Sequence, residues 1–221
     1  MSLQFDSVGT SPKRAKTYQR EPITLTQIDL TKEQALSIAS FVHATDPKGF
    51  GGTDHIKLSV VDSIATVTAT NRYIIAEQTF PVLSSSDGFE FLLAPEHIKA
   101  IKDTKSAVSI TVIDGTMTIY KGDGSTALPT ANKYVKFPEI GSIWSGVEET
   151  TKPVSALRLN FELLVKIAKL KSESDIGSKA DSTFDIYLQG ETETAKPKAI
   201  LLKRENLRVL VQPLIVPKTN Y

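Results

Sequence analysis

The stretch that decides the fold is Ala69-Thr70-Asn71-Arg72-Tyr73-Ile74-Ile75-Ala76. Thr70 ends a run in which apolar and polar residues alternate, which is typical of a half-buried strand. Asn71 tolerates the backbone angles of a tight turn, and apolar residues resume after Tyr73. The stretch by itself predicts only a turn between two strands, so its meaning depends on the rest of the chain.

Composition excludes several classes of protein. The chain has 221 residues, of which 40% are hydrophobic and 23% charged, as in an ordinary soluble protein with room for one large or two small domains. It has no cysteine, which excludes disulfides, Cys-based zinc sites and thiol catalysis. Its apolar runs are shorter than the ~20 residues of a membrane span, and no signal-peptide pattern opens it, so we expect a cytoplasmic location without membrane partners.

The net charge is only +1. Any affinity for nucleic acid must therefore come from charge gathered on one face. Residues 1–21 are polar and include Ser11-Pro12-Lys13-Arg14-Ala15-Lys16. They predict a flexible N-terminal arm, either simply solvated or in contact with DNA.

One order of elements recurs three times: a strand, a helix, then three strands. The first copy has strands at 23–28, 56–61, 65–70 and 73–80, with a helix from Thr31 to Val42. The second has strands at 89–93, 108–113, 117–120 and 131–137, with a helix opened by Pro95. The third has strands at 156–159, 184–188, 198–203 and 207–211, with a helix at 161–170.

This order predicts an α+β fold of repeated units, whose short consecutive strands and tight turns favour antiparallel sheets. We expect a full domain of two units at 22–138, a linker at 139–153, a half-domain of one unit at 154–216 and a tail at 217–221.

The opening stretch resembles the Ala-Thr-Asp-Arg-Tyr-Arg-Leu-Ala signature of bacterial sliding clamps, the ring-shaped beta subunits that keep DNA polymerase III on its template. Further resemblances follow in the same order as in that family. They lie in Leu92-Leu93-Ala94-Pro95-Glu96-His97-Ile98-Lys99-Ala100-Ile101, in Lys136-Phe137-Pro138-Glu139-Ile140 and in Leu210-Val211-Gln212-Pro213-Leu214. Together they cover about residues 22–216.

The chain also departs from the family. Asn71 replaces an aspartate, Ile74 an arginine, and Gln212 and Leu214 methionines. Clamps have six units per chain, whereas three are predicted here. This is the pattern of a shortened, divergent relative, for example one from a phage or prophage.

The resemblance implies a groove that captures short apolar peptides of polymerases and other DNA-processing proteins. Its walls would be Thr70, Arg72, Tyr73, Ile74, Ile75, Pro138, Ile143, Leu210, Val211, Gln212, Pro213 and Leu214. Apolar side chains with a few polar atoms at the rim suit that task. The alternative is that these residues are simply an interdomain core.

The resemblance also implies double-stranded DNA on the helix face, held through phosphates without base reading. The candidate contacts are Lys99, Lys102, Lys105, Lys166 and Lys169. The alternative is a solvated lysine face. We predict no cofactor, metal or catalytic site, because the three histidines lack metal-ligand spacing and Gly49-Phe50-Gly51-Gly52 has no following Lys-Ser/Thr.

An odd number of units leaves one half-domain without a partner. The third units of two chains can pair across a two-fold axis, giving a dimer and from two dimers a six-domain ring. Alternatively, the third unit packs on the second in a monomer. The predicted function is a non-enzymatic processivity factor; the alternative is an interaction module or replisome regulator that encircles nothing.

Overall fold

The computed structural model describes residues 25–86, 88–122, 124–131, 134–144, 159–176, 183–188 and 199–212. The predicted arm, the tail, most of the strand at 156–159, Pro213 and Leu214 lie outside this part of the chain. No helix in the described part is long and apolar enough to cross a membrane.

The first unit contains the described elements β1 (Thr26–Leu30), α1 (Lys32–Ser40), η1 (Phe41–Ala44), η2 (Phe50–Gly52), β2 (Ile56–Val61), β3 (Ile64–Thr70), β4 (Ile74–Pro81) and β5 (Ser84–Ser85). The second contains β6 (Phe89–Leu93), α2 (Pro95–Lys102), β7 (Val108–Ile113), β8 (Thr116–Lys121) and β9 (Gly124–Pro129). After α3 (Gly141–Trp144), the third contains α4 (Phe161–Ile167), η3 (Glu173–Asp175), β10 (Asp185–Leu188), β11 (Ile200–Arg204) and β12 (Leu207–Val211).

The first two units exchange their first strands. β1 pairs antiparallel with β7 of the second unit, and β6 pairs antiparallel with β2 of the first. The result is a five-stranded sheet in the order β5-β1-β7-β8-β9 and a seven-stranded sheet in the order β10-β11-β12-β4-β3-β2-β6. Each of these two units therefore completes the sheet of the other, and the predicted α+β class with antiparallel sheets is confirmed.

The third unit joins the first, not the second as the monomer alternative supposed. β12 pairs antiparallel with β4 from Leu207↔Gln78 to Val211↔Ile74. Hydrogen bonds add to this junction: Asn206 Nδ2 donates to Thr79 O at 2.8 Å and the Lys171 amide donates to Ser40 Oγ at 3.0 Å. One continuous sheet thus carries strands of all three units.

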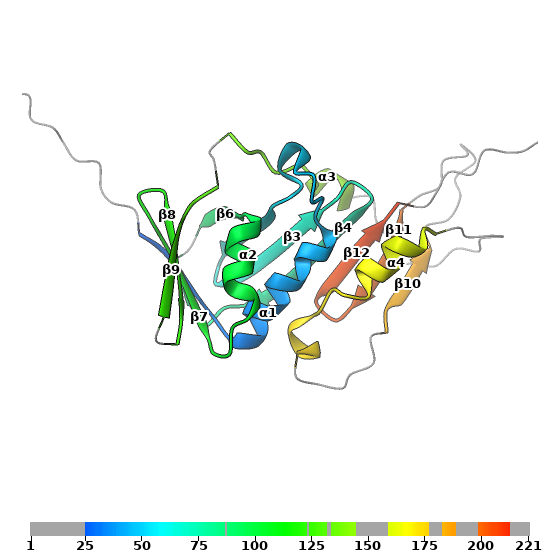
Figure 1. Cartoon of the computed structure of the whole chain (residues 1–221). Helices are drawn as coiled ribbons and strands as arrows, with labels where there is room; N and C mark the ends of the chain where they lie inside the picture. The colour runs from blue at the N-terminus through cyan, green and yellow to red at the C-terminus, as the bar shows by residue number, and fades with distance from the viewer. Residues whose placement is uncertain are drawn as a thin grey trace, which may run out of the picture.

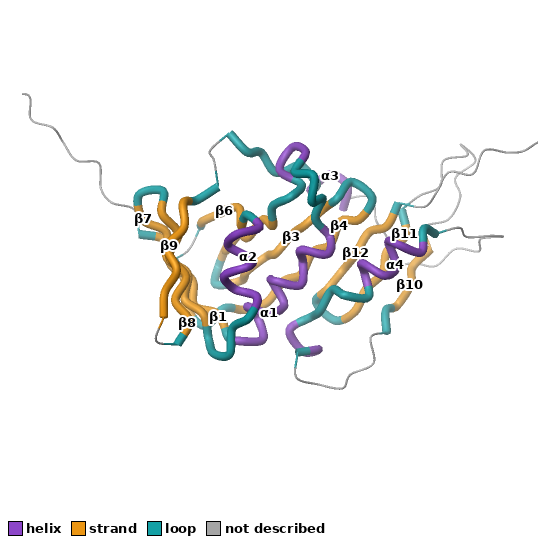
Figure 2. The backbone as a smooth tube through the Cα atoms, in the orientation of Figure 1, coloured by secondary structure: helices purple, strands orange, loops and turns teal. Residues whose placement is uncertain are grey.

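The helices α1, α2 and α4 cover the same face of the seven-stranded sheet, as Figures 1 and 2 show. α1 begins with a capping box in which the Gln34 amide donates to Thr31 Oγ1 and the Thr31 amide to Gln34 Oε1. In α2 the place of Gln34 is taken by His97, whose Nδ1 accepts from the Ala94 amide at 2.9 Å. The main core lies between these helices and the sheets, around Ile38, Leu58 and Val209.

The strand predicted at 131–137 is wrong. The last strand of the second unit is β9, Gly124–Pro129, whose residues are mostly exposed and do not alternate in polarity. Beyond it the described residues 134–140 contain no helix or strand, and they pass close to Gly52. A Cβ on Gly52 would meet Lys136 O, and its positive φ of 76° also favours glycine. This path leads to α3, a short helix inside the segment predicted as a linker.

Candidate functional site

The turn between β3 and β4 is built from its own side chains. Asn71 Oδ1 accepts from the amides of Tyr73 at 3.1 Å and Ile74 at 2.9 Å. Thr70 Oγ1 donates to Ile74 O at 2.8 Å and accepts from the Arg72 amide at 3.1 Å. The sequence therefore specifies this turn locally, through hydrogen bonds of the type that Asn and Thr make with nearby backbone.

Arg72 has a positive φ of 76°, an uncommon backbone conformation for a residue with a Cβ. The turn leaves Arg72 exposed, and the Tyr73 side chain keeps 61% of its surface in contact with solvent. An exposed tyrosine held on a rigid turn is well suited to bind another molecule, because little conformational freedom remains to be lost.

The pairing of β4 with β12 brings this turn beside the end of the third unit. Leu210 lies opposite Ile75, Val211 lies opposite Ile74, and the Gln212 amide donates to Tyr73 O at 3.0 Å. Because side chains alternate across a sheet, Ile74 and Val211 point into the main core while Ile75 and Leu210 point to the other face.

On that other face the apolar side chains form a separate cluster. Ile75, Leu201 and Leu210 are its buried members, and Ile140, Trp144, Tyr187 and Ala199 pack against them. These side chains form an apolar row that crosses four strands of the sheet, from β4 to β10, and α3 covers this row. We call the set Arg72, Tyr73, Ile75, Ile140, Trp144 and Leu210 the junction surface.

Arg208 of β12 contacts Trp144, which covers the buried apolar row. Its guanidinium carbon lies 4.1 Å from the centre of the Trp144 ring, and it forms an ion pair with Glu77 of β4. Arginine stacks well on indole rings and pairs with carboxylates at the same time. A charged pair therefore adjoins the apolar row.

The structure brings together most of the residues predicted for the groove. Thr70, Ile74 and Val211 are buried and support the surface from within, while Pro138 is half-buried and Ile143 is 45% exposed. Sequence reasoning missed Ile140, Trp144, Leu201 and Arg208. Trp144 is the single tryptophan of the chain and offered the one available signal, an aromatic residue inside a predicted linker.

The five predicted DNA-facing lysines lie on α2 and α4 or directly after them. Lys99, Lys102, Lys105 and Lys169 are exposed, and Lys166 is half-buried. Two of these lysines lie close enough to His43 of η1 to affect its charge. Burial is the main cause that lowers the pKa of His43, and the positive charges of Lys169 and Lys102 lower it further. The lysines of two units therefore act together on one part of the helix face.

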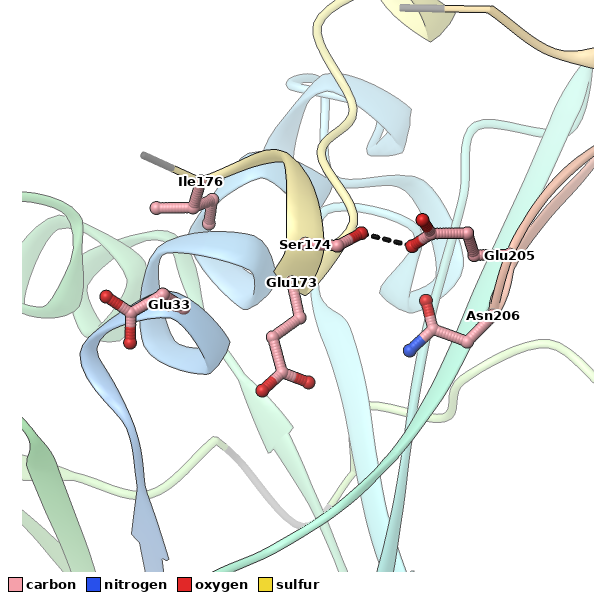
Figure 3. A pocket seen from close by; sticks show the side chains of 6 residues that line it. All are labelled: Glu33, Glu173, Ser174, Ile176, Glu205 and Asn206. Atoms are coloured by element: carbon pink, nitrogen blue, oxygen red, sulfur yellow. Dashed lines mark hydrogen bonds between the residues drawn. The ribbon is translucent and has the colours of Figure 1, made fainter. Parts of the chain in front are cut away.

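An open surface pocket of about 410 Å³ lies away from the junction surface, between α1, η3 and the β11–β12 turn (Figure 3). It is lined by Glu33, Glu173, Ser174, Ile176, Glu205 and Asn206. Burial raises the pKa of Glu173, with Glu33 contributing in the same direction. In the described part of the chain, no group of three or more His, Cys, Asp or Glu residues could hold a metal ion.

Comparison with solved structures identifies the fold. The beta chain of DNA polymerase III from Streptococcus pneumoniae superposes with a TM-score of 0.61 and 11% identity, over 88% of this chain and 66% of that one. The Bacillus subtilis sliding clamp gives 0.62 and 13%, over 89% and 67%. The Helicobacter pylori beta clamp bound to a DNA ligase peptide gives 0.58 and 14%, over 88% and 68%.

The fold is thus that of the bacterial sliding clamps, as the resemblance implied, in a chain that spans about two thirds of their length. No protein-family model matches this sequence, and no curated protein does either.

Proposed function

We propose that this protein is a non-enzymatic tether of the sliding-clamp type, which holds DNA-processing proteins through the junction surface. The observation that carries the proposal is the register of β4 with β12, which places the exposed Tyr73 beside the apolar pair Ile75 and Leu210. Two segments far apart in the sequence meet there to form one composite surface.

The chemistry of the junction surface suits a short apolar peptide. The half-buried Trp144 offers apolar contact above the buried Ile75 and Leu210, and the exposed Tyr73 adds a large ring that loses little entropy on binding. Arg72 and the Arg208–Glu77 pair supply charge around this apolar region. The Helicobacter neighbour carries a DNA ligase peptide, and we propose partners of that class here: polymerases or other DNA-processing proteins with a short binding motif.

The helix face completes the proposal. Lys99, Lys102 and Lys105 are exposed at α2, and Lys169 brings a further charge close to His43. Lysines that touch phosphates bind duplex DNA without reading its sequence, which is what sliding requires. We propose a cytoplasmic role in replication or repair as a homo-oligomer of two or four chains.

Peptide binding is tested with the fluorescence of Trp144. Because Trp144 is the single tryptophan, its emission reports on the junction surface alone. The full chain is titrated with the ligase peptide of the Helicobacter complex and with a scrambled peptide of equal composition. A saturable change with the first peptide alone supports the proposal. No change, together with no heat of binding by calorimetry, overturns the proposed peptide site.

A DNA test separates the clamp from the interaction module. The protein is assembled on nicked circular DNA with a clamp loader, and its retention is compared after the circle is linearised. Retention on the circle and loss from the linear form support encirclement. Peptide binding without retention identifies an interaction module that encircles nothing.

A further inference from the structure

The third unit lacks the cover that the first two units give each other. On β2, the helix-facing side chains of Ile56, Leu58 and Val60 are fully buried, and on β7 those of Val108 and Ile110 are 1% exposed. β10 holds the same place in the third unit. Its Ile186 faces the helix side, paired with the buried Leu202, yet remains 50% exposed.

The helices show the same difference. Four residues after the N-cap, Ala35 of α1 and Ile98 of α2 are buried, and these two helices pack on each other. Leu164 holds this position in α4 and is only half-buried. Eight residues after the N-cap, Ala39 of α1 is buried, whereas Ala168 of α4 is exposed, as is Lys102 of α2. The flank of α4 that corresponds to the α1–α2 contact is therefore open.

Two larger apolar side chains adjoin this open flank. Phe161 is 75% exposed and Val165 is 39% exposed. Lys32 and Pro95 stand at the place of Phe161 in the other two helices, and Leu36 and Lys99 at the place of Val165. We call Phe161, Leu164, Val165, Ala168 and Ile186 the α4–β10 face. Exposed apolar residues grouped in this way mark an interaction surface.

In the described part of the chain, the backbone edge of β10 is open in the same way as the side chains around it. The outer edge of β2 pairs with β6, and the outer edge of β7 pairs with β1. Within the residues that the structure describes, β10 pairs only with β11 and its outer edge carries no strand. Free backbone donors and acceptors at a sheet edge favour pairing with another strand.

We propose that the α4–β10 face binds the same face of a second copy of this chain across a two-fold axis. The second copy supplies what the second unit supplies to the first: a helix against the helix and a strand against the open edge. All five side chains of the face are apolar, so two identical faces meet without charge repulsion.

Leu159 precedes the α4 N-cap Asn160. Leu30 and Leu93 hold this place in the first two units, where they end β1 and β6, the strands that cross to the other unit. Leu159 thus corresponds to the end of the strand that the first two units exchange.

This inference specifies how the homo-oligomer of the proposed function assembles. It rests on the proposed function only for the existence of that homo-oligomer. It is independent of peptide binding, since the junction surface lies on the opposite side of the sheet. The two ideas therefore fail separately. A monomer that still binds the ligase peptide overturns the pairing alone, and a dimer that binds no peptide overturns the peptide site alone.

The chain contains no cysteine, so one introduced thiol gives an unambiguous cross-link. Ala168→Cys places a thiol on the α4–β10 face near the two-fold axis, and Lys99→Cys places one on the exposed side of α2 as a matched control. With a short bis-maleimide, we expect a covalent species of twice 24.1 kDa, or 48.2 kDa, for A168C and none for K99C. A 48.2 kDa species with K99C but not with A168C overturns the proposed face.

Light scattering of the full chain over a concentration range gives the second measurement. We expect a mass of 48.2 kDa or a multiple of it, and a shift toward 24.1 kDa for Ile186→Asp. Ile113→Asp, at an exposed position on β7, is the control and should leave the mass unchanged. A constant 24.1 kDa for the unsubstituted chain overturns the proposal, whatever the I186D variant does. Circular dichroism shows whether each variant is folded.

Discussion

The guanidinium carbon of Arg208 lies 4.1 Å from the centre of the Trp144 ring. Because Arg208 also pairs with Glu77, this one side chain connects α3, β12 and β4. α3 consists of four residues, none of them buried, and it has too few backbone hydrogen bonds to hold its place unaided. The stacked pair therefore helps decide whether α3 stays on the apolar row beneath it.

Replacing Arg208 by Ala should release this cover. We expect the emission of Trp144 to shift to longer wavelength and its quenching by acrylamide to increase, because the indole gains contact with water. A stacked cation at a partly exposed site is worth about 1 kcal/mol, so the free energy of unfolding should fall by roughly that amount. Lys203→Ala, on the same face of the neighbouring strand, is the control; equal spectra for R208A and the unsubstituted chain would contradict the role of the stacked pair.

Asn71 should matter through its side-chain oxygen. Asn71→Ala removes the acceptor of two backbone amides, Tyr73 and Ile74, and the Ile74 amide is buried. Leaving such a donor without a partner costs about 1–3 kcal/mol. Asn71→Asp keeps the oxygen and should cost much less. Urea denaturation of the two variants decides the point: similar losses for both would show that the turn does not depend on this acceptor.

Tyr73→Ala should weaken peptide binding without unfolding the chain. Tyr73 is exposed, so its removal leaves no cavity, while an aromatic anchor in a peptide contact is worth about 2 kcal/mol or more. We expect the dissociation constant of the ligase peptide to rise at least tenfold, measured by Trp144 fluorescence. Tyr120→Ala, an exposed tyrosine on β8, should leave it unchanged. Equal affinities for the two variants would remove Tyr73 from the site.

The stability of the protein should fall on acidification, and His97 should be one cause. The Ala94 amide donates to His97 Nδ1, so Nε2 carries the proton and donates to Pro129 O at 2.9 Å; the ring is neutral with both nitrogens occupied. Burial lowers the pKa of His97 from its usual 6.5. Above about pH 6.5 both the folded and unfolded states are neutral at this residue. Below it the unfolded state takes up the proton first, so stability is lost as the pH falls.

His97→Gln should reduce this loss, because Gln34 already makes the corresponding hydrogen bond in α1. The melting temperature of the variant should change less between pH 8 and pH 5.5 than that of the unsubstituted chain. Some dependence remains, since the pKa of His43 is lowered as well. An unaltered pH profile would exclude His97 as a cause.

Lys102→Gln should lower the affinity for duplex DNA and its dependence on salt. If Lys102 contacts a phosphate, the slope of the logarithm of the binding constant against the logarithm of salt concentration falls by about 0.9. Lys57→Gln is the control, because Lys57 lies on the other face of the sheet and pairs with Glu90 at 2.6 Å. Equal slopes for K102Q and K57Q would show that Lys102 does not contact DNA.

The parts of the fold that depend on local chemistry could be predicted from the sequence. The turn at Asn71 and the helix start at Thr31 are specified by neighbouring residues, and the predictions there agree with the structure. β9 could not be predicted, because an exposed strand such as Gly124–Pro129 carries no alternation of polarity. Its pairing with β8 is a tertiary contact that sequence periodicity does not record.

For the candidate site too, the features that depend on distant residues could be predicted only in part. The segments that contain Tyr73 and Leu210 were predicted to lie together, and the structure places them side by side. The inward direction of Ile74 and Val211, however, follows from the register of two distant strands. Trp144 and Arg208 were missed for the same reason. Nothing in the residues around Trp144 shows that it will lie over β12, since the stacking partner is far away in the sequence.

The alternation of β12 has a consequence for evolution. Leu210 points toward the junction surface and its neighbour Val211 toward the helices that carry the lysines, so adjacent positions of one strand belong to opposite sides of the protein. Exposed outward residues can diversify to follow a new partner, while the buried residues on both sides, Leu210 included, remain under selection for packing. A one-residue insertion in β12 has no such freedom, because it would exchange the two sides at once.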